Sequence, residues 1–376
     1  MAFHFTIARD NILHAISTQQ NITSKKGTLA ILSNVLIQAE QDKIIVTGTD
    51  LEIGLKQIIP AEVIEQGELT LPAKKIFEIA RESNSDTLTF QEKENQWVEI
   101  TTGSSLYKLA GMVSDEFPQF PEYNEENMVE MEASIMADLI DKTVFSIAHD
   151  RENMYSLTAA LIRKEEEGKK RFLKMISSDG HRLTMMNKEV DESIDGLQLN
   201  PVTLIPRRGI QEIRKFCEDV DVFMIGFDQK QAVLKSEGAL LIIRLMEGDF
   251  PDIQSIIDII SMENIIEIDR FRFLESLKRI NLFTEDMFKT VKIEIADNHI
   301  LLTSQNADMG SAKDEFEIKY KGEALNLGFN CRYLIETLQV MEGNTIKAII
   351  SSDESPCLII SDDDEGFSSI IMPMKL

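Results

Sequence analysis

The sequence predicts an α+β fold made of three tandem copies of one domain, each with two helices and several antiparallel strands. Three features lead to this prediction: a helical segment, a strand that ends in a polar turn, and a strand followed by a helix. They recur in that order along the 376 residues, and the copies begin about 130 residues apart. We expect domains at residues 1–125, 126–254 and 255–376.

The first recurring feature is a helical segment near the start of each copy, at residues 10–16, 138–144 and 273–280. Apolar residues at three- and four-residue intervals are typical of a helix that packs one face on a core. In the second copy, the predicted apolar stripe consists of Ile135, Leu139, Ile140, Val144 and Ile147.

The second feature is an apolar strand that runs into a polar turn, at residues 44–50, 173–179 and 300–306. Asp50, Asp179 and Asn306 end these segments at spacings of 129 and 127 residues. Asp and Asn favour turns because their side chains accept hydrogen bonds from nearby backbone N–H groups. We therefore expect a hairpin turn after each of these strands.

The third feature is a strand followed directly by a helix, at residues 69–79, 202–213 and 327–338. Pro72 and Pro206 suit the first turn of a helix, where a missing N–H costs nothing. Asn330 is a favourable N-cap for the third copy.

Short alternating strands fill the rest of each copy, as in residues 87–90, 232–235 and 347–350. Phe-Pro pairs preceded by an acidic residue close the first two copies, at residues 116–118 and 249–251. The spacing of strands and turn residues predicts antiparallel sheets, with connectors near 122–128 and 252–262.

Composition excludes several classes of protein. Charged residues make up 27% and hydrophobic residues 43%, and no apolar run approaches the roughly 20 residues of a membrane span. The start of the chain lacks the pattern of a signal peptide. Cys217, Cys331 and Cys357 are odd in number and far apart, which argues against a disulfide framework or a structural zinc site. We expect a cytoplasmic protein.

Motifs for catalysis or for cofactor and metal binding are missing, so we expect no cofactor, no metal and no enzyme. The sequence has no Walker-A loop, GxGxxG or HExxH, and the acidic run at 362–366 lacks the alternation of a calcium loop. We interpret that run as an acidic hairpin turn. A hydrolase that uses His181 and Asp179 remains an alternative.

The formal net charge of −25 argues against nucleic acid as a partner unless the 39 Lys and Arg residues gather on one face. Cations do cluster on the predicted helices, whereas acidic residues concentrate in turns and connectors. Solvated helix faces with ordinary ion pairs would explain any single cluster. Recurrence at equivalent places favours a functional surface.

Residues 177–183, 247–252 and 372–376 resemble the bacterial DNA polymerase III beta subunits, the sliding clamps. The resemblance covers the whole chain, including its triplication. It implies a DNA-clamp architecture, with a head-to-tail homodimer closed into a ring and helices lining the hole. Duplex DNA would pass through the hole without sequence readout. A processivity factor of this kind has no reaction of its own, and it works in the cytoplasm at the nucleoid.

The resemblance also implies partners that bind through short linear motifs: the replicative polymerase, the clamp loader, translesion polymerases, mismatch-repair proteins and ligase. Their groove would lie between the second and third domains. Its expected residues are Leu157, Ser178, Gly180, His181, Arg182, Leu183, Pro251, Ile256, Phe288, Asn330, Tyr333, Ile370, Ile371, Met372, Pro373, Met374, Lys375 and Leu376. Ser178, Ser255 and Lys375 depart from residues common in the family.

Two further surfaces follow from the resemblance. Tyr107 and Leu109 of one subunit would meet Leu282 and Phe283 of the other at the dimer seam, although they could equally be core residues. The cations expected to face DNA are Lys25, Lys26, Lys74, Lys75, Arg151, Arg207, Arg208, Arg214 and Lys278. A monomeric peptide-binding adaptor with the same triplicated fold remains the alternative to a ring.

Overall fold

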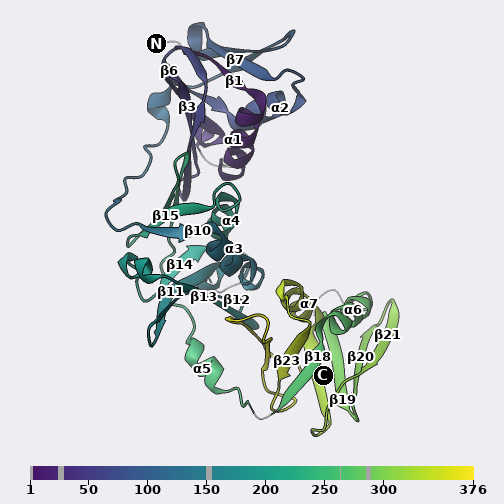
Figure 1. Cartoon of the computed structure of the whole chain (residues 1–376). Coiled ribbons are helices and arrows are strands. Elements are labelled where there is room, and N and C mark those ends of the chain that lie inside the picture. Colours follow the sequence, from purple (N-terminus) through teal and green to yellow (C-terminus); the bar gives the residue numbers. More distant parts are fainter. Residues whose placement is uncertain (1–2, 24–28, 150–154, 263, 285–288) are drawn as a thin grey trace. The chain divides into compact units, whose positions relative to one another are not determined.

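The computed structural model describes residues 3–23, 29–149, 155–262, 264–284 and 289–376. The chain forms two compact units, each built from helices and antiparallel sheets (Figure 1). The first unit comprises Met1–Glu132, Asp195–Gln198 and Glu218–Leu245, and the second comprises Ala133–Ile194, Leu199–Cys217 and Met246–Leu376. The α+β class and the antiparallel pairing are as predicted, whereas the three domain boundaries remain a prediction.

Two sheets form the framework of the first unit. The five-stranded sheet has the order β5 (Glu62–Glu65), β1 (His4–Ala8), β7 (Thr87–Glu92), β8 (Trp97–Thr102), β9 (Ser105–Ala110). The eight-stranded sheet has the order β10 (Val129–Glu132), β15 (Val222–Phe227), β16 (Gln231–Lys235), β17 (Ala239–Arg244), β4 (Ile53–Pro60), β3 (Lys43–Thr49), β2 (Asn34–Glu40), β6 (Gly67–Pro72).

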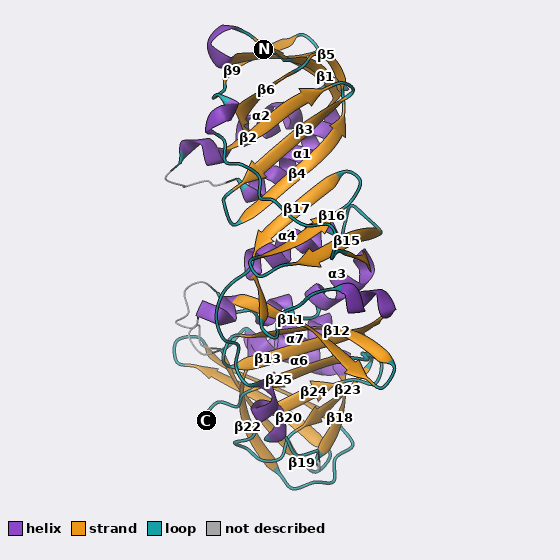
Figure 2. Cartoon of the chain, turned by 90° about the vertical axis from the view of Figure 1, so that its left-hand side faces the viewer, coloured by secondary structure: helices purple, strands orange, loops and turns teal. Residues whose placement is uncertain are grey.

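Helices α1 (Arg9–Ile22) and α2 (Ala73–Glu82) pack side by side against these sheets (Figure 2). Ile12 and Ile16 of α1 and Ile76 of α2 are fully buried in one cluster with inward-facing residues of the strands. Apolar residues at helical spacing thus meet alternate residues of the sheets, which is the pattern that buries both kinds of element.

The second unit repeats this plan. Its eight-stranded sheet has the order β14 (Thr203–Pro206), β11 (Ala159–Glu167), β12 (Lys170–Ser178), β13 (Arg182–Val190), β25 (Phe367–Ile371), β24 (Cys357–Ile360), β23 (Thr345–Ile349), β18 (Ile265–Asp269). Its four-stranded sheet has the order β21 (Gly310–Glu317), β20 (His299–Asn306), β19 (Thr290–Ala296), β22 (Leu325–Asn330).

The described residues of the second unit contain five α-helices: α3 (Ala133–Asp141), α4 (Arg207–Phe216), α5 (Ile253–Asp258), α6 (Arg270–Asn281) and α7 (Cys331–Val340). Asn330 caps α7 as expected, because its side chain accepts a hydrogen bond from the backbone N–H of Arg332 at 3.0 Å. Asp269 caps α6 in the same way, accepting from the N–H of Arg272 at 2.7 Å.

The predicted apolar stripe in the second copy was partly wrong. Helix α3 begins at Ala133 and ends at Asp141, so Val144 and Ile147 lie beyond it, and Met136 takes the buried place expected of Ile135. Val144 begins a separate 3-10 turn, and Ile147 is buried there without belonging to the helix. Apolar spacing alone did not mark the end of the helix.

Both large sheets cross from one sequence copy to the next. Strand β4, which follows the Asp50 turn, pairs with β17, the last strand of the second copy. Strand β13, which follows the Asp179 turn, pairs in the same way with β25, the last strand of the third copy. The strand after the polar turn of one copy therefore pairs with the closing strand of the next copy.

Candidate functional site

The turn between β12 and β13 is held by its own polar side chains. The Asp179 carboxylate accepts hydrogen bonds from the backbone N–H groups of His181 and Arg182 at 3.0 and 3.1 Å. The Ser178 hydroxyl donates to the Arg182 carbonyl at 2.7 Å. Gly180 has a φ of +87°, which a residue with a side chain adopts at a cost. This places Ser178 in the frame of the turn and leaves His181 exposed.

Arg182 links this turn to α7 from a buried position. Its guanidinium donates to Asp179, to Glu336 and to the Phe145 carbonyl at 2.9, 2.7 and 2.6 Å. It also lies 4.3 Å from the ring centroid of Tyr333. A guanidinium with this many partners is a fixed support, so Arg182 orients Tyr333 and the turn.

Sequence reasoning missed several of these supporting residues. Glu336 could have been found as the i+4 partner of Arg332, whose side chain it binds at 2.6 Å. Phe145 contributes a backbone carbonyl and a ring 5.1 Å from the Arg182 guanidinium carbon, and no sequence signal marks either contribution.

The C-terminal segment after β25 is tied down at two points. The Met372 N–H donates to the His181 carbonyl at 2.9 Å, and the Met374 N–H donates to the Gly328 carbonyl of β22 at 2.8 Å. A Cβ at residue 328 would come within 2.6 Å of the Met374 carbonyl oxygen, so only glycine admits the segment there. The side chains of Met372 and Leu376 remain 43% and 61% exposed. The end of the chain is thus a fixed apolar wall.

An apolar floor lies beside this wall. Leu183 and Ile370 are buried neighbours on β13 and β25, and Ile256 of α5 packs against their cluster. Asp252 caps α5, and the Ser255 hydroxyl donates to its carboxylate at 2.5 Å, which lowers the pKa of Asp252. We call the region of His181, Leu183, Ile256, Ile370 and residues 372–376 the tail groove.

The remaining residues expected in the groove take different positions. Leu157 and Ile371 are buried, Tyr333 and Asn330 are half-buried, and Pro251 is exposed. Pro373 and Met374 are half-buried, whereas Lys375 is exposed. Phe288 lies outside the described residues. The assignment of these residues to partner binding remains a prediction.

The acidic run at 362–366 is a turn, but it is not simply a solvated hairpin. Asp364 is buried and accepts hydrogen bonds from Lys142 at 2.9 Å and from the N–H groups of Glu342 and Gly343. Although burial alone would raise the pKa of Asp364, these donors hold it below its ordinary value. The same contact raises the pKa of Lys142 against the opposing effect of burial. This pair joins α3 of the second copy to the third copy.

The expected DNA-facing cations differ in their availability. Lys74 and Lys75 are 79% and 59% exposed and, among the described residues, form ion pairs with Glu78, whose pKa they lower. Lys278 is exposed as well, and Arg208 is exposed although it takes part in an interaction. In contrast, Arg207 donates to the Ile147 carbonyl, and Arg214 is bound to Asp141 at 2.8 Å. Lys25, Lys26 and Arg151 lie outside the described residues.

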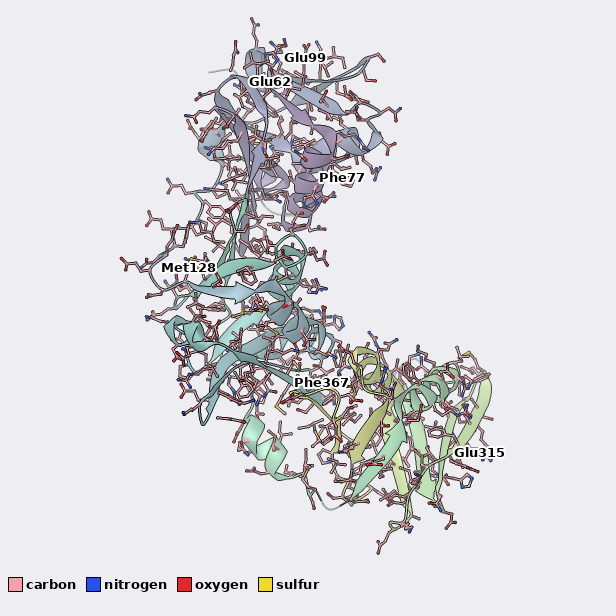
Figure 3. The ribbon with its side chains drawn as sticks, in the orientation of Figure 1. Glu62, Phe77, Glu99, Met128, Glu315 and Phe367 are labelled. Carbon is pink, nitrogen blue, oxygen red and sulfur yellow. The ribbon has the colours of Figure 1, made fainter. Side chains whose placement is uncertain are left out.

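The four residues expected at a seam lie near two free strand edges. Tyr107 and Leu109 are on β9, half-buried against the core of the first unit. Leu282 is 70% exposed just after α6, and the Phe283 ring lies beside Gly310 at the start of β21. Strands β9 and β21 are each the last strand of their sheet, as is visible for β21 and its Glu315 in Figure 3.

Comparison with known proteins assigns the chain to a family. Models of the N-terminal, central and C-terminal domains of the DNA polymerase III beta subunit match residues 3–121, 130–252 and 261–375. The chain belongs to the DNA polymerase III beta subunit family. Its function is therefore that of a sliding clamp, a processivity factor for DNA polymerase.

Relatives cover the chain from end to end. The beta sliding clamp of Chlamydia pneumoniae is 27% identical over 99% of each chain, and that of Haemophilus influenzae is 27% identical over 99% of this chain and all of its own. The solved clamp of Caulobacter crescentus is 26% identical with a TM-score of 0.92, covering all of this chain and 99% of its own. A Pseudomonas aeruginosa clamp bound to griselimycin is 25% identical with a TM-score of 0.90, covering all of both chains.

The described residues contain no group of three or more His, Cys, Asp or Glu side chains that could hold a metal ion. Across the same ranges, no helix is long and apolar enough to cross a membrane.

Proposed function

We propose that two copies of this chain form a head-to-tail ring around duplex DNA and tether partner proteins through the tail groove, with no catalysis by the ring itself. The observation that carries the ring is the pairing rule between sequence copies. The strand after a polar turn pairs with the closing strand of the next copy, once in each unit.

The third application of this rule requires a second chain. Strand β21 follows the Asn306 turn of the third copy, and β9 closes the first copy. Both have one free edge. Free edges of this kind pair readily with another strand. Pairing of β21 with β9 of a second chain, and the reverse at the other end, closes a ring of six equivalent domains.

The internal repeats also give the register of this seam. Ile53 and Arg182 lie opposite Ile243 and Ile371 at the two internal junctions. Asn306 pairs across its turn with Gly310, because the third turn is one residue longer than those at Asp50 and Asp179. Gly310 is therefore the counterpart of Ile53 and Arg182.

The closing strand of the first copy is aligned by isolated bridges. Met112 pairs with Thr70 as Met246 pairs with Leu204, so Leu109 is the counterpart of Ile243. The seam then sets Gly310 opposite Leu109 and Ala312 opposite Tyr107. Phe283 beside Gly310 would meet the Leu109 side chain, which agrees with the expected apolar seam.

The helices supply the surface that would face DNA. Lys74, Lys75, Arg208 and Lys278 are exposed cations on α2, α4 and α6. Contacts of Lys and Arg with phosphate are independent of sequence and weaken with salt, which suits a ring that slides. Retention then comes from closure of the ring, so a net charge of −25 is compatible with DNA as the partner.

The tail groove offers an apolar slot for short linear motifs. Its exposed Met372 and Leu376 side chains stand beside the Leu183, Ile256 and Ile370 cluster. In the Caulobacter crescentus structure, polyethylene glycol is described in a beta-motif tethering region. We propose that this groove takes motifs from the polymerase, the clamp loader, translesion polymerases, mismatch-repair proteins and ligase, in the cytoplasm at the nucleoid.

Two experiments test this function. The clamp loaded on closed circular DNA should stay bound through a gel-filtration column and leave when the DNA is cut once. Loss at the same rate before and after cutting would refute encirclement and favour a monomeric adaptor. Removal of residues 372–376 should abolish binding of a Gln-Leu-Asp-Leu-Phe peptide without dissociating the dimer. Retained affinity would refute the placement of the groove.

A further inference from the structure

The outer face of the β4–β17 junction is the counterpart, one copy earlier, of the tail groove. In the second unit, Leu183 of β13 and Ile370 of β25 are covered by Ile253 of the connector helix α5. In the first unit, the same places on the strands belong to Gly54 and Ile242, and the connector supplies Phe120. The Phe120 ring lies so close to Gly54 that a Cβ there would be 3.0 Å away.

This face contains two adjoining hollows. One has a volume of about 540 Å³ and is lined by Lys56, Ile58 and Phe120, among others. The other has a volume of about 320 Å³ and is lined by Glu130, Met224 and Met128, among others. Of these residues, Met128 is labelled in Figure 3. Both hollows are bordered by Lys235, Ser236 and Glu237, so they form one elongated depression. We call it the β4–β17 groove.

Exposed apolar side chains lie along this groove. Ile58 is 41% exposed at one end, and Val222 and Met224 are 44% and 36% exposed at the other. Large aliphatic side chains that line a hollow on the solvent face of a sheet are a typical feature of a binding surface. An elongated hollow suits an extended chain better than a compact ligand.

The groove carries charges of both signs: Lys56 shares the first hollow with Glu122, Glu130 lies in the second, and Glu237 borders both. The Lys56 ammonium lies 4.7 Å from the centre of the Phe120 ring, and no carboxylate of the described residues lies within ion-pair distance of it. The Lys56 position corresponds to the apolar Met185 in the second unit. In the second hollow, Lys235 is bound to Glu125 at 2.6 Å, which leaves Glu130 and the bordering Glu237 without that cation.

We propose that the β4–β17 groove is a second docking site. Its ligand is an extended peptide with a carboxylate for Lys56, a cation for Glu130 and Glu237, and bulky aliphatic side chains between them. Charge complementarity at these groups selects this occupant. The choice of a peptide rests on the proposed function of the tail groove, whereas the hollow and its charges do not.

Calorimetry with the peptide Arg-Gln-Leu-Asp-Leu-Phe tests the proposal on three forms of the full chain. The unmodified chain should bind two peptides, and the form that lacks residues 372–376 should bind one. Adding Lys56→Met to the truncated form should weaken the remaining site about fivefold, the most that a partly exposed ion pair contributes. Lys230→Met is the matched control, because Lys230 is exposed on the β15–β16 turn outside the groove.

Each result separates this proposal from the function of the tail groove. One site in the unmodified chain and none after truncation would overturn the second site and leave the tail groove intact. One site in both forms, weakened by Lys56→Met, would support the second site and refute the tail groove. If Lys56→Met leaves the affinity of the second site unchanged, the β4–β17 groove is not the peptide site. If the truncated chain self-associates and Lys56→Met abolishes this association, the groove binds a second copy of the chain and not a peptide.

Discussion

A cysteine pair across the proposed seam gives the sharpest test of the ring. We expect Ala312→Cys combined with Tyr107→Cys to form a disulfide between two chains under mild oxidation. At the β4–β17 junction, the Arg244 N–H donates to the Glu52 carbonyl and the Ile58 N–H donates to the Gly238 carbonyl. Hydrogen-bonded and non-hydrogen-bonded residue pairs therefore alternate between these two points. By this alternation, Ala312 and Tyr107 would form a non-hydrogen-bonded pair in the proposed seam, with Cα atoms about 4.5 Å apart.

That separation falls inside the range of roughly 4.4–6.8 Å found in disulfides. The native thiols should not interfere. All three are buried, and burial raises the pKa of Cys331 and Cys357 to about 12. At pH 8 only about one in 10,000 of those two thiols would be ionised, against about a quarter of an ordinary exposed thiol.

Denaturing electrophoresis without reductant reads the result. One bond should give a species of about 85 kDa, twice the 42.7 kDa of a single chain. A second bond should give a circular dimer of different mobility, which circular DNA would retain after denaturation. The control is Ala312→Cys with Lys108→Cys, one residue along β9, whose side chain points to the other face of the sheet. Equal bonding in both variants, or bonding in neither, would refute the register.

Three further predictions concern other parts of the molecule. Lys74→Glu with Lys278→Glu should weaken loading onto DNA and flatten the salt dependence of loading, with the dimer intact by light scattering; unchanged loading would count against the helices as the DNA surface. Gly328→Val should displace the C-terminal segment and lower the affinity of the Gln-Leu-Asp-Leu-Phe peptide at least tenfold in a polarisation assay, and unaltered binding would contradict the fixed wall. Lys142→Met should lower the free energy of unfolding by about 3 kcal/mol in urea, because it leaves Asp364 buried without its cation. In the unmodified chain, the pKa of Asp364 is lower in the folded state than in the unfolded state. Its contribution to the free energy of unfolding should therefore be complete above the unfolded pKa of about 3.9 and should be lost as the pH falls through the folded pKa. A free energy of unfolding that stays constant across that acid range would contradict this prediction.

Much of the organisation was readable from local patterns. The three polar turns, the N-cap at Asn330 and the strand–helix units are as predicted, because each depends on a few neighbouring residues. The end of α3 was not readable, since the apolar spacing continues past Asp141 after the helix has stopped. Nor was the extra residue in the third turn, which shifts the register of β21 by one.

In the region predicted to form the groove, the contacts of individual side chains were harder to predict than the strands that carry them. Sequence reasoning placed Arg182 among the groove residues, and the structure puts its guanidinium beneath them, bound to Asp179 and Glu336. The burial of Asp364 was missed because its partner Lys142 is 222 residues away. No local pattern reports a contact over such a distance.

The amino-acid sequence by itself determined the triplication, the class of fold and the cationic helices, because these depend on short-range periodicity that repeats along the chain. The tertiary structure decided which strand edges are paired and which are free, where the end of the chain is anchored, and which charged side chains form ion pairs within the molecule. These depend on contacts between segments far apart in the chain, and a hydrogen bond forms only where the fold brings its donor and acceptor within about 3 Å of each other.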